Sequence, residues 1–193
     1  MLSIGKTLTP EQRLSKAVVA IMGKAQALSG VIMIGDRSIE YNEEKVPTAC
    51  TNGRDEWYGA KFIEPLNDAQ LRFLVLHEVY HKLYRHLTTW QHLYKINPQL
   101  ANMACDYVIN VKIMDEFGAD DWVEMIEGGC YDVEYRGWDA AKVFWELHKQ
   151  LEKPPQGGGG SGLPDSQAQD GDEAVDGKTT GSHNTAVGNL PQG

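Results

Sequence analysis

The stretch Leu71-Arg-Phe-Leu-Val-Leu-His-Glu-Val-Tyr-His-Lys-Leu-Tyr-Arg85 has the apolar spacing of a buried helix. Asn67 and Gln70, three residues apart and just before it, match the pattern of a capping box. No glycine or proline interrupts residues 68–89, so the sequence predicts one continuous helix there. Its apolar positions, three or four residues apart, are Leu71, Leu74, Val75, Val79 and Leu83.

This helix carries an H-E-x-x-H motif at His77, Glu78 and His81. Residues four apart on a helix lie on one face, so the two imidazoles can hold one zinc ion. Glu78 lies about 100° round the helix from His77 and can reach an activated water without binding the ion. A chance match would leave both histidines on a solvated face, whereas this motif lies within an apolar helix. The motif therefore predicts a zinc-dependent hydrolase, most directly a peptidase.

His86 is the next histidine along the chain, but a continuous helix would point it away from the ion. It is rotated by about 140° from His81 and by about 180° from His77. Metzincins have a glycine after the second histidine, whereas Leu83 and Tyr84 are compatible with further helix here. We therefore expect His86 to be exposed or to lie in a second layer around the site.

A second helical segment, residues 98–117, offers a better third ligand in Asp106. Asn102, Asp106 and Asn110 recur every four residues and form a narrow polar stripe on an otherwise apolar helix. A carboxylate flanked by two amides suits a metal ligand that is held by neighbouring hydrogen bonds. The alternative is that Asp106 pairs with an arginine or caps a neighbouring helix.

Other side chains are reserve candidates for the site. Asp115 and Glu116 are reserve ligands, although they fall near the end of the second helix. An aromatic side chain could stabilise a developing oxyanion, and packing is the alternative role for each such residue. The aromatic candidates are Tyr107, Trp122, Tyr131 and Tyr135.

Three stretches in order, Pro47–Arg54, Leu76–His81 and Asn102–Asn110, resemble a metallopeptidase domain of bacterial and phage proteins. In longer members that domain precedes a von Willebrand A-like domain, whereas this chain continues into a low-complexity tail. The resemblance covers roughly residues 7–150.

What the resemblance implies is a zincin-type domain with His77 and His81 as zinc ligands. It further implies Glu78 as the catalytic base and Asp106 as the third ligand. The resemblance supports an inference of fold and site more directly than an inference of substrate.

The remaining patterns predict an α+β, zincin-like domain in which an N-terminal helix and a small sheet precede the two helices of the site. Asn52-Gly53 is a strong hairpin signal. The expected elements are a helix from Thr9-Pro10 towards Leu28 that exits at Gly30, strands at 31–34, 46–51 and 56–60, a loop at 36–45, and a last helix at 139–151. Residues 46–60 either pair with an extended substrate or form an ordinary structural sheet.

We expect residues 1–153 to form this domain and residues 154–193 to form a disordered, Gly-rich acidic tail. The formal net charge of −9 and the lack of a basic stripe argue against nucleic-acid binding. No apolar run approaches about 18 residues, which argues against a membrane span. The three cysteines lack a C-x-x-C pair and suit a reducing compartment. We therefore expect a cytoplasmic protein, in the host cytoplasm if phage-encoded.

The function predicted from the sequence is peptide hydrolysis with one zinc ion per chain and Glu78 as general base. The partner is then a peptide or protein substrate, and the acidic tail is a candidate surface for a protein partner. Two alternatives remain open. One is a zinc-stabilised, catalytically inactive interaction module, and the other is a zinc amidohydrolase that acts on a substrate other than a peptide.

Overall fold

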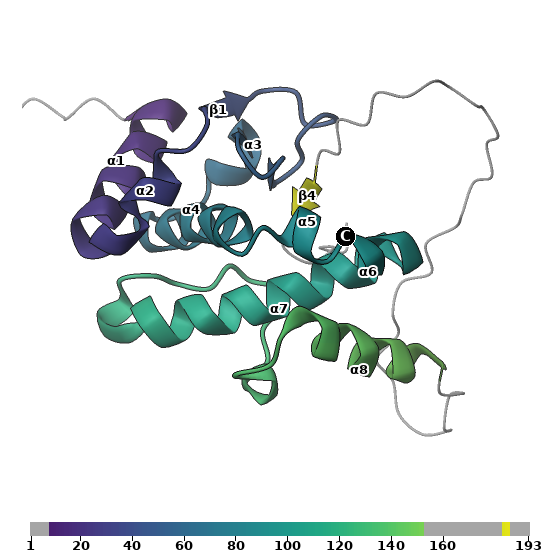
Figure 1. The fold of residues 1–193 in the computed structure, drawn as a ribbon. Helices are drawn as coiled ribbons and strands as arrows, with labels where there is room; N and C mark the ends of the chain where they lie inside the picture. The colour runs from purple at the N-terminus through teal and green to yellow at the C-terminus, as the bar shows by residue number, and fades with distance from the viewer. Residues whose placement is uncertain (1–7, 153–182, 186–193) are drawn as a thin grey trace, which may run out of the picture.

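The computed structural model describes residues 8–152 and 183–185, and it confirms the mixed α+β class (Figure 1). The helices are α1 (Pro10–Lys24), α2 (Ser29–Ile32), α3 (Ala60–Ile63), α4 (Asp68–Leu83), α5 (His86–Thr89), α6 (Gln91–Ile96), α7 (Pro98–Phe117) and α8 (Ala140–Glu152), with 3-10 turns η1 (Gln26–Leu28), η2 (Ala119–Asp121) and η3 (Val133–Tyr135). The strands are β1 (Arg37–Glu40), β2 (Ala49–Thr51), β3 (Glu56–Gly59) and β4 (His183–Thr185).

The long helices and the sheet are stacked in layers. Figure 1 shows α4 between the small sheet and α7, with α8 on the other side of α7. Helix α1 also packs against α4. The two helices that carry the H-E-x-x-H motif and Asp106 are therefore direct neighbours in the centre of the fold.

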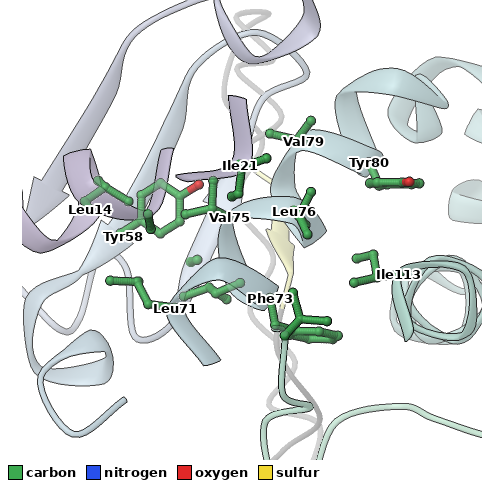
Figure 2. Packing of buried hydrophobic residues seen from close by; sticks show 14 of the residues in the cluster. Leu14, Ile21, Tyr58, Leu71, Phe73, Val75, Leu76, Val79, Tyr80 and Ile113 are labelled. Atoms are coloured by element: carbon green, nitrogen blue, oxygen red, sulfur yellow. The ribbon is translucent and has the colours of Figure 1, made fainter. Parts of the chain in front are cut away.

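Helix α4 begins where the sequence predicts and is buried on all sides. The Asn67 side chain accepts from the backbone amides of Ala69 and Gln70, and the Gln70 side chain accepts from the Asn67 amide, which completes the capping box. Every residue from Phe73 to Lys82 is buried. Figure 2 shows its apolar side chains packed between Leu14, Ile21 and Tyr58 on one side and Ile113 of α7 on the other.

The predicted continuation of this helix to residue 89 is wrong. Helix α4 ends at Leu83, and Arg85 has a left-handed backbone with φ of 52° before α5 starts at His86. A non-glycine residue adopts this conformation only where surrounding contacts hold it. The break turns the chain back towards the site.

Helix α7 matches the predicted segment from Pro98 to Phe117, and α8 lies close to the predicted last helix. Helix α1 has the expected Thr9 cap but ends at Lys24, so the predicted exit at Gly30 is wrong because α2 runs through that position.

The sheet has the strand order β1-β3-β2-β4. Strands β2 and β3 form the predicted antiparallel hairpin, with Cys50 opposite Trp57. The predicted strand at 31–34 is wrong, because α2 covers its first two residues and a turn follows. Strand β1 instead lies in the segment 36–45 that was expected to be a loop, and it pairs in parallel with β3. This pairing depends on residues about 20 positions apart, which a local pattern does not reveal.

Gly35 permits the close approach that brings β1 to β3. Its φ is 75°, and a Cβ at this position would lie 2.1 Å from the Arg54 carbonyl oxygen. Only glycine fits such a contact in this backbone conformation.

A buried ionic cluster joins the sheet to α4. The Glu56 carboxylate on β3 contacts Lys82 Nζ at 2.5 Å and Arg37 Nε at 2.5 Å, and it accepts a hydrogen bond from the Tyr58 hydroxyl at 2.7 Å. Lys82 also donates to the Ile34 carbonyl at 2.9 Å. The side chains of Glu56 and Lys82 are each only 1% exposed. Since Lys82 directly follows His81, this cluster helps to fix the end of α4 against the sheet.

Glu56→Gln is expected to lower the free energy of unfolding by about 3–5 kcal/mol, because two cations lose their buried counter-ion. Lys82→Met should cost less, since Arg37 still neutralises Glu56. Urea unfolding of the two variants checks the order. Equal losses, or a larger loss for Lys82→Met, would show that the cluster does not act through charge balance.

Among the described residues, no helix combines the length and the apolar composition that crossing a bilayer requires. The predicted tail, residues 154–193, lies outside the described residues except for β4.

Candidate metal centre

Three buried side chains converge between α4 and α7. His77 and His81 come from α4 and Asp106 comes from α7, and each is at most 2% exposed. The His77 and His81 Nε2 atoms are 3.2 Å apart, and Asp106 Oδ1 lies 3.1 Å from His81 Nε2 and 3.6 Å from His77 Nε2. The structure therefore brings together the three residues that the sequence predicts as ligands.

The spacing of these three atoms fits a tetrahedral ion. Zinc bonds to imidazole nitrogen and carboxylate oxygen are about 2.1 Å long, which places any two tetrahedral ligands about 3.4 Å apart. The observed separations of 3.1, 3.2 and 3.6 Å bracket that value. Two imidazoles and one carboxylate also match the donor set of catalytic zinc sites.

The hydrogen bonds around His77 leave its Nε2 atom free to bind a cation. Its Nδ1 lies 2.8 Å from Asn110 Oδ1, while Asn110 Nδ2 donates to the Cys130 carbonyl at 2.9 Å. Because the amide nitrogen already donates, Asn110 Oδ1 accepts, and His77 Nδ1 must carry the proton. The lone pair of this imidazole is therefore on Nε2, which faces the cluster.

His86 contacts His81 on the ring nitrogen that faces away from the cluster. The two Nδ1 atoms are 3.0 Å apart, and the His86 side chain is buried. One of these two nitrogens must donate and the other accept. When His81 uses Nε2 as a ligand, its Nδ1 donates to His86. The expectation that a continuous helix points His86 away is wrong, because the left-handed backbone of Arg85 ends the helix. His86 instead lies in a second layer around the site, which was the other place predicted for it.

Asp106 presents one oxygen to the histidines and the other to Asn102. Asn102 Nδ2 donates to Asp106 Oδ2 at 3.1 Å, which leaves Oδ1 to face the two imidazoles. The alternative in which Asp106 pairs with an arginine does not occur among the described residues. The two amides of the predicted stripe thus orient two different members of the cluster.

Burial shifts the proton affinities of the cluster in opposite directions. Loss of solvation lowers the pKa of His77 to about 4, against a weaker raising effect of the Asn110 hydrogen bond. The same loss of solvation raises the pKa of Asp106 well above its usual value. A buried carboxylate needs a nearby positive charge, and a bound cation would supply it.

Glu78 is fully buried on the residue after His77, and it is not one of the three convergent ligand residues. Its negative charge acts on the phenol of Tyr58. Burial first, and then the negative charges of Glu56 and Glu78, raise the pKa of Tyr58 well above its usual value. Glu78 therefore lies beside the cluster, on the side of the sheet.

The reserve ligands lie elsewhere. Asp115 accepts from Arg136 at 2.7 Å, and Glu116 pairs with Lys112 at 2.7 Å. Of the four aromatic candidates, Tyr107 packs edge-on against Tyr135. Trp122 packs against Phe117, with the Arg72 guanidinium 5.1 Å from its ring centre.

Two tyrosines that the sequence did not single out contact residues next to the site or bonded to it. The Tyr58 hydroxyl donates to Glu56, which contacts Lys82, and the Tyr94 hydroxyl donates to the sulfur of Cys105, the residue before Asp106. They come from β3 and α6, and no spacing in the sequence links either to the motif. Only the packing of distant segments brings them there.

Residues 9–190 match a family described as "Putative metallopeptidase domain". The chain belongs to this family. The match spans more than half of the sequence and confirms the resemblance seen in the three sequence stretches. The chain matches no curated protein and no solved structure. Membership in the family and the buried cluster together indicate a metal-binding hydrolase domain.

Proposed function

We propose that the chain is a zinc-dependent metallopeptidase with His77, His81 and Asp106 as the ligands of one zinc ion. The observation that carries the proposal is the convergence of three buried donor atoms at tetrahedral spacing, with a buried glutamate on the adjacent residue of the same helix. Three ligands among the described residues leave a fourth position, as in catalytic rather than structural zinc sites. We infer that the domain has a zincin-type fold.

When bound, zinc would act as a Lewis acid that lowers the pKa of water towards about 7 and polarises a substrate carbonyl. The protein positions its ligands for this role. Asn110 sets the tautomer of His77, His86 pairs with Nδ1 of His81, and Asn102 sets the rotation of the Asp106 carboxylate. Fixed ligands of this kind require little rearrangement on binding.

Glu78 is the proposed general base. Its carboxylate takes a proton from the attacking water and passes it to the amine of the leaving product. Its burial in α4 keeps this carboxylate away from bulk water. The ligand residues cannot perform this step, since their basic atoms face the cation.

A direct test uses the full chain, stripped with a chelator and reloaded with zinc. We expect one zinc per chain and cleavage of a quenched-fluorescence peptide library that is lost on stripping and restored by zinc. Stoichiometric zinc without any hydrolysis would instead support an inactive interaction module. Hydrolysis of small amides or esters, but of no peptide, would support the amidohydrolase alternative.

Zinc affinity should fall as the pH is lowered. His77, with a pKa of about 4, is already neutral near pH 7, whereas the raised pKa of Asp106 makes its carboxyl more ready to hold a proton in the metal-free centre. Zinc must displace that proton, so the dissociation constant should rise about tenfold for each pH unit below the Asp106 pKa. Competition with a coloured chelator between about pH 5.5 and 8 measures the slope. A constant affinity over this range would contradict the assignment.

A further inference from the structure

The edge of β2 that faces away from β3 is covered by a distant part of the same chain. Strand β4, His183–Thr185, pairs antiparallel with Ala49–Thr51, and Cys50 lies opposite Asn184. Without β4, β2 would be an edge strand with unpaired backbone groups. Such an edge is the structure to which an extended peptide adds as a further strand.

Strand β2 belongs to a hairpin that contacts the helix of the candidate metal centre. Thr51 pairs across the hairpin with Glu56, and the Glu56 carboxylate contacts Lys82 at 2.5 Å. Lys82 is the residue after the proposed ligand His81. Strand β2 also packs directly on α4.

The turn after β2 reaches the segment that carries His86. A Cβ at Gly53 would lie 3.8 Å from Leu87 Cδ1, so the hairpin turn rests on α5. In the view of Figure 1, β4 is drawn directly above α5. A strand laid along this edge therefore lies beside a hairpin that contacts both α4 and α5.

We infer that the β2 edge is the docking site for an extended peptide substrate and that His183–Thr185 is an internal occupant that competes for it. This inference rests on the proposed peptidase function. The match to the metallopeptidase family extends to residue 190 and so includes the occupant strand. The pairing covers three residues, so displacement of β4 breaks few backbone hydrogen bonds.

Recognition at such an edge uses backbone hydrogen bonds, so the ligand class is an extended peptide with little demand on its sequence. A covalently attached occupant acts at an effective concentration that can reach about 1 mM. A free peptide must exceed that concentration or bind more tightly. The full chain should therefore turn over added peptides slowly until β4 is displaced.

The test places proline in β4 of the full chain. Successive backbone N–H groups of a strand point to opposite sides, so either Asn184→Pro or Thr185→Pro removes a donor aimed at β2. Gln167→Pro is the matched control, because it adds a proline to the same C-terminal region but outside the strand. The probe is a fluorescent synthetic peptide of residues 180–188, and Glu78→Gln in every protein prevents its cleavage.

We expect at least one of the two strand variants to bind the probe about tenfold more tightly than the control or the parent does. Hydrogen exchange at the amides of residues 49–51 should also become faster in that variant without probe. With Glu78 restored, kcat/KM for added peptides should rise by a similar factor. Equal probe binding by all four proteins would overturn the inference.

The two proposals can fail separately. Tighter probe binding by a strand variant, in a protein that hydrolyses no peptide even with zinc, would support the docking edge and reject the peptidase. Peptide hydrolysis that is the same in both strand variants and in the control would reject the internal occupant and keep the peptidase. If the probe binds the parent in a stoichiometry of two chains, a second copy supplies the strand and the inference also fails.

Discussion

Glu78→Gln is expected to lower peptide hydrolysis by about 10²- to 10⁴-fold while zinc content stays at one per chain. Glutamine keeps the size of the side chain and its buried position but cannot accept the proton of the attacking water. The cluster of His77, His81 and Asp106 does not include this residue, so the ligands should hold the ion unchanged. Steady-state rates and metal analysis of the same preparation measure both effects.

Glu44→Gln is the matched control, because this glutamate is exposed on the surface. It should leave both activity and zinc content unaltered. Glu78→Asp should retain part of the activity, since the carboxylate remains but is shorter. A Glu78→Gln protein that loses zinc in proportion to activity would mean that Glu78 acts by supporting the site rather than by moving a proton.

Asp106→Ala is expected to weaken zinc binding by about 10³-fold. Structural zinc sites bind with about 10–16 kcal/mol, so the loss of one ligand in three removes roughly 3–5 kcal/mol. At about 1.4 kcal/mol per factor of ten, that corresponds to two to four orders of magnitude. Competition with a chelator of known affinity measures the dissociation constant, and thermal unfolding measures how much added zinc stabilises each protein.

Two variants on the same helix bracket this effect. Asn102→Ala removes only the hydrogen bond to Asp106 Oδ2 and should cost about 10- to 100-fold in affinity. Asp115→Asn changes a surface carboxylate that pairs with Arg136 and should not change zinc affinity. The metal-free Asp106→Ala protein should be no less stable than its parent, because a buried carboxyl without a cation contributes little. Equal zinc affinity for Asp106→Ala and its parent would exclude Asp106 as a ligand.

Local sequence signals located most of the site. The Asn67–Gln70 capping box fixed where α4 begins, and the apolar spacing showed that His77 and His81 lie in a buried helix. The polar stripe on α7 predicts Asp106 together with the two amides that hydrogen-bond to His77 and to Asp106. These features can be predicted because they depend on residues within one or two helical turns.

Elements that depend on contacts between distant segments could not be predicted from local sequence patterns. The predicted strand at 31–34 is wrong because a short apolar run fits either a helix or a strand. In the folded chain, packing against the core favours the helix α2. Strand β1 forms because β3 offers it a parallel edge, and Gly35 allows the approach. The role of His86 depends on the left-handed backbone of Arg85, which the helical propensity of its neighbours opposes.

The sequence by itself determined the chemistry of this protein: two imidazoles and a glutamate at helical spacing, and a carboxylate between two amides on a second helix. The tertiary structure alone decided that α4 and α7 pack so that three proposed ligand atoms lie 3.1 to 3.6 Å apart. It also decided that His86 returns to hold His81, that Glu56 joins the sheet to Lys82, and that β4 covers the edge of β2. The physical reason is range: capping and periodicity act over a few residues, whereas burial, ion pairing and strand addition join segments that only the folded chain brings together.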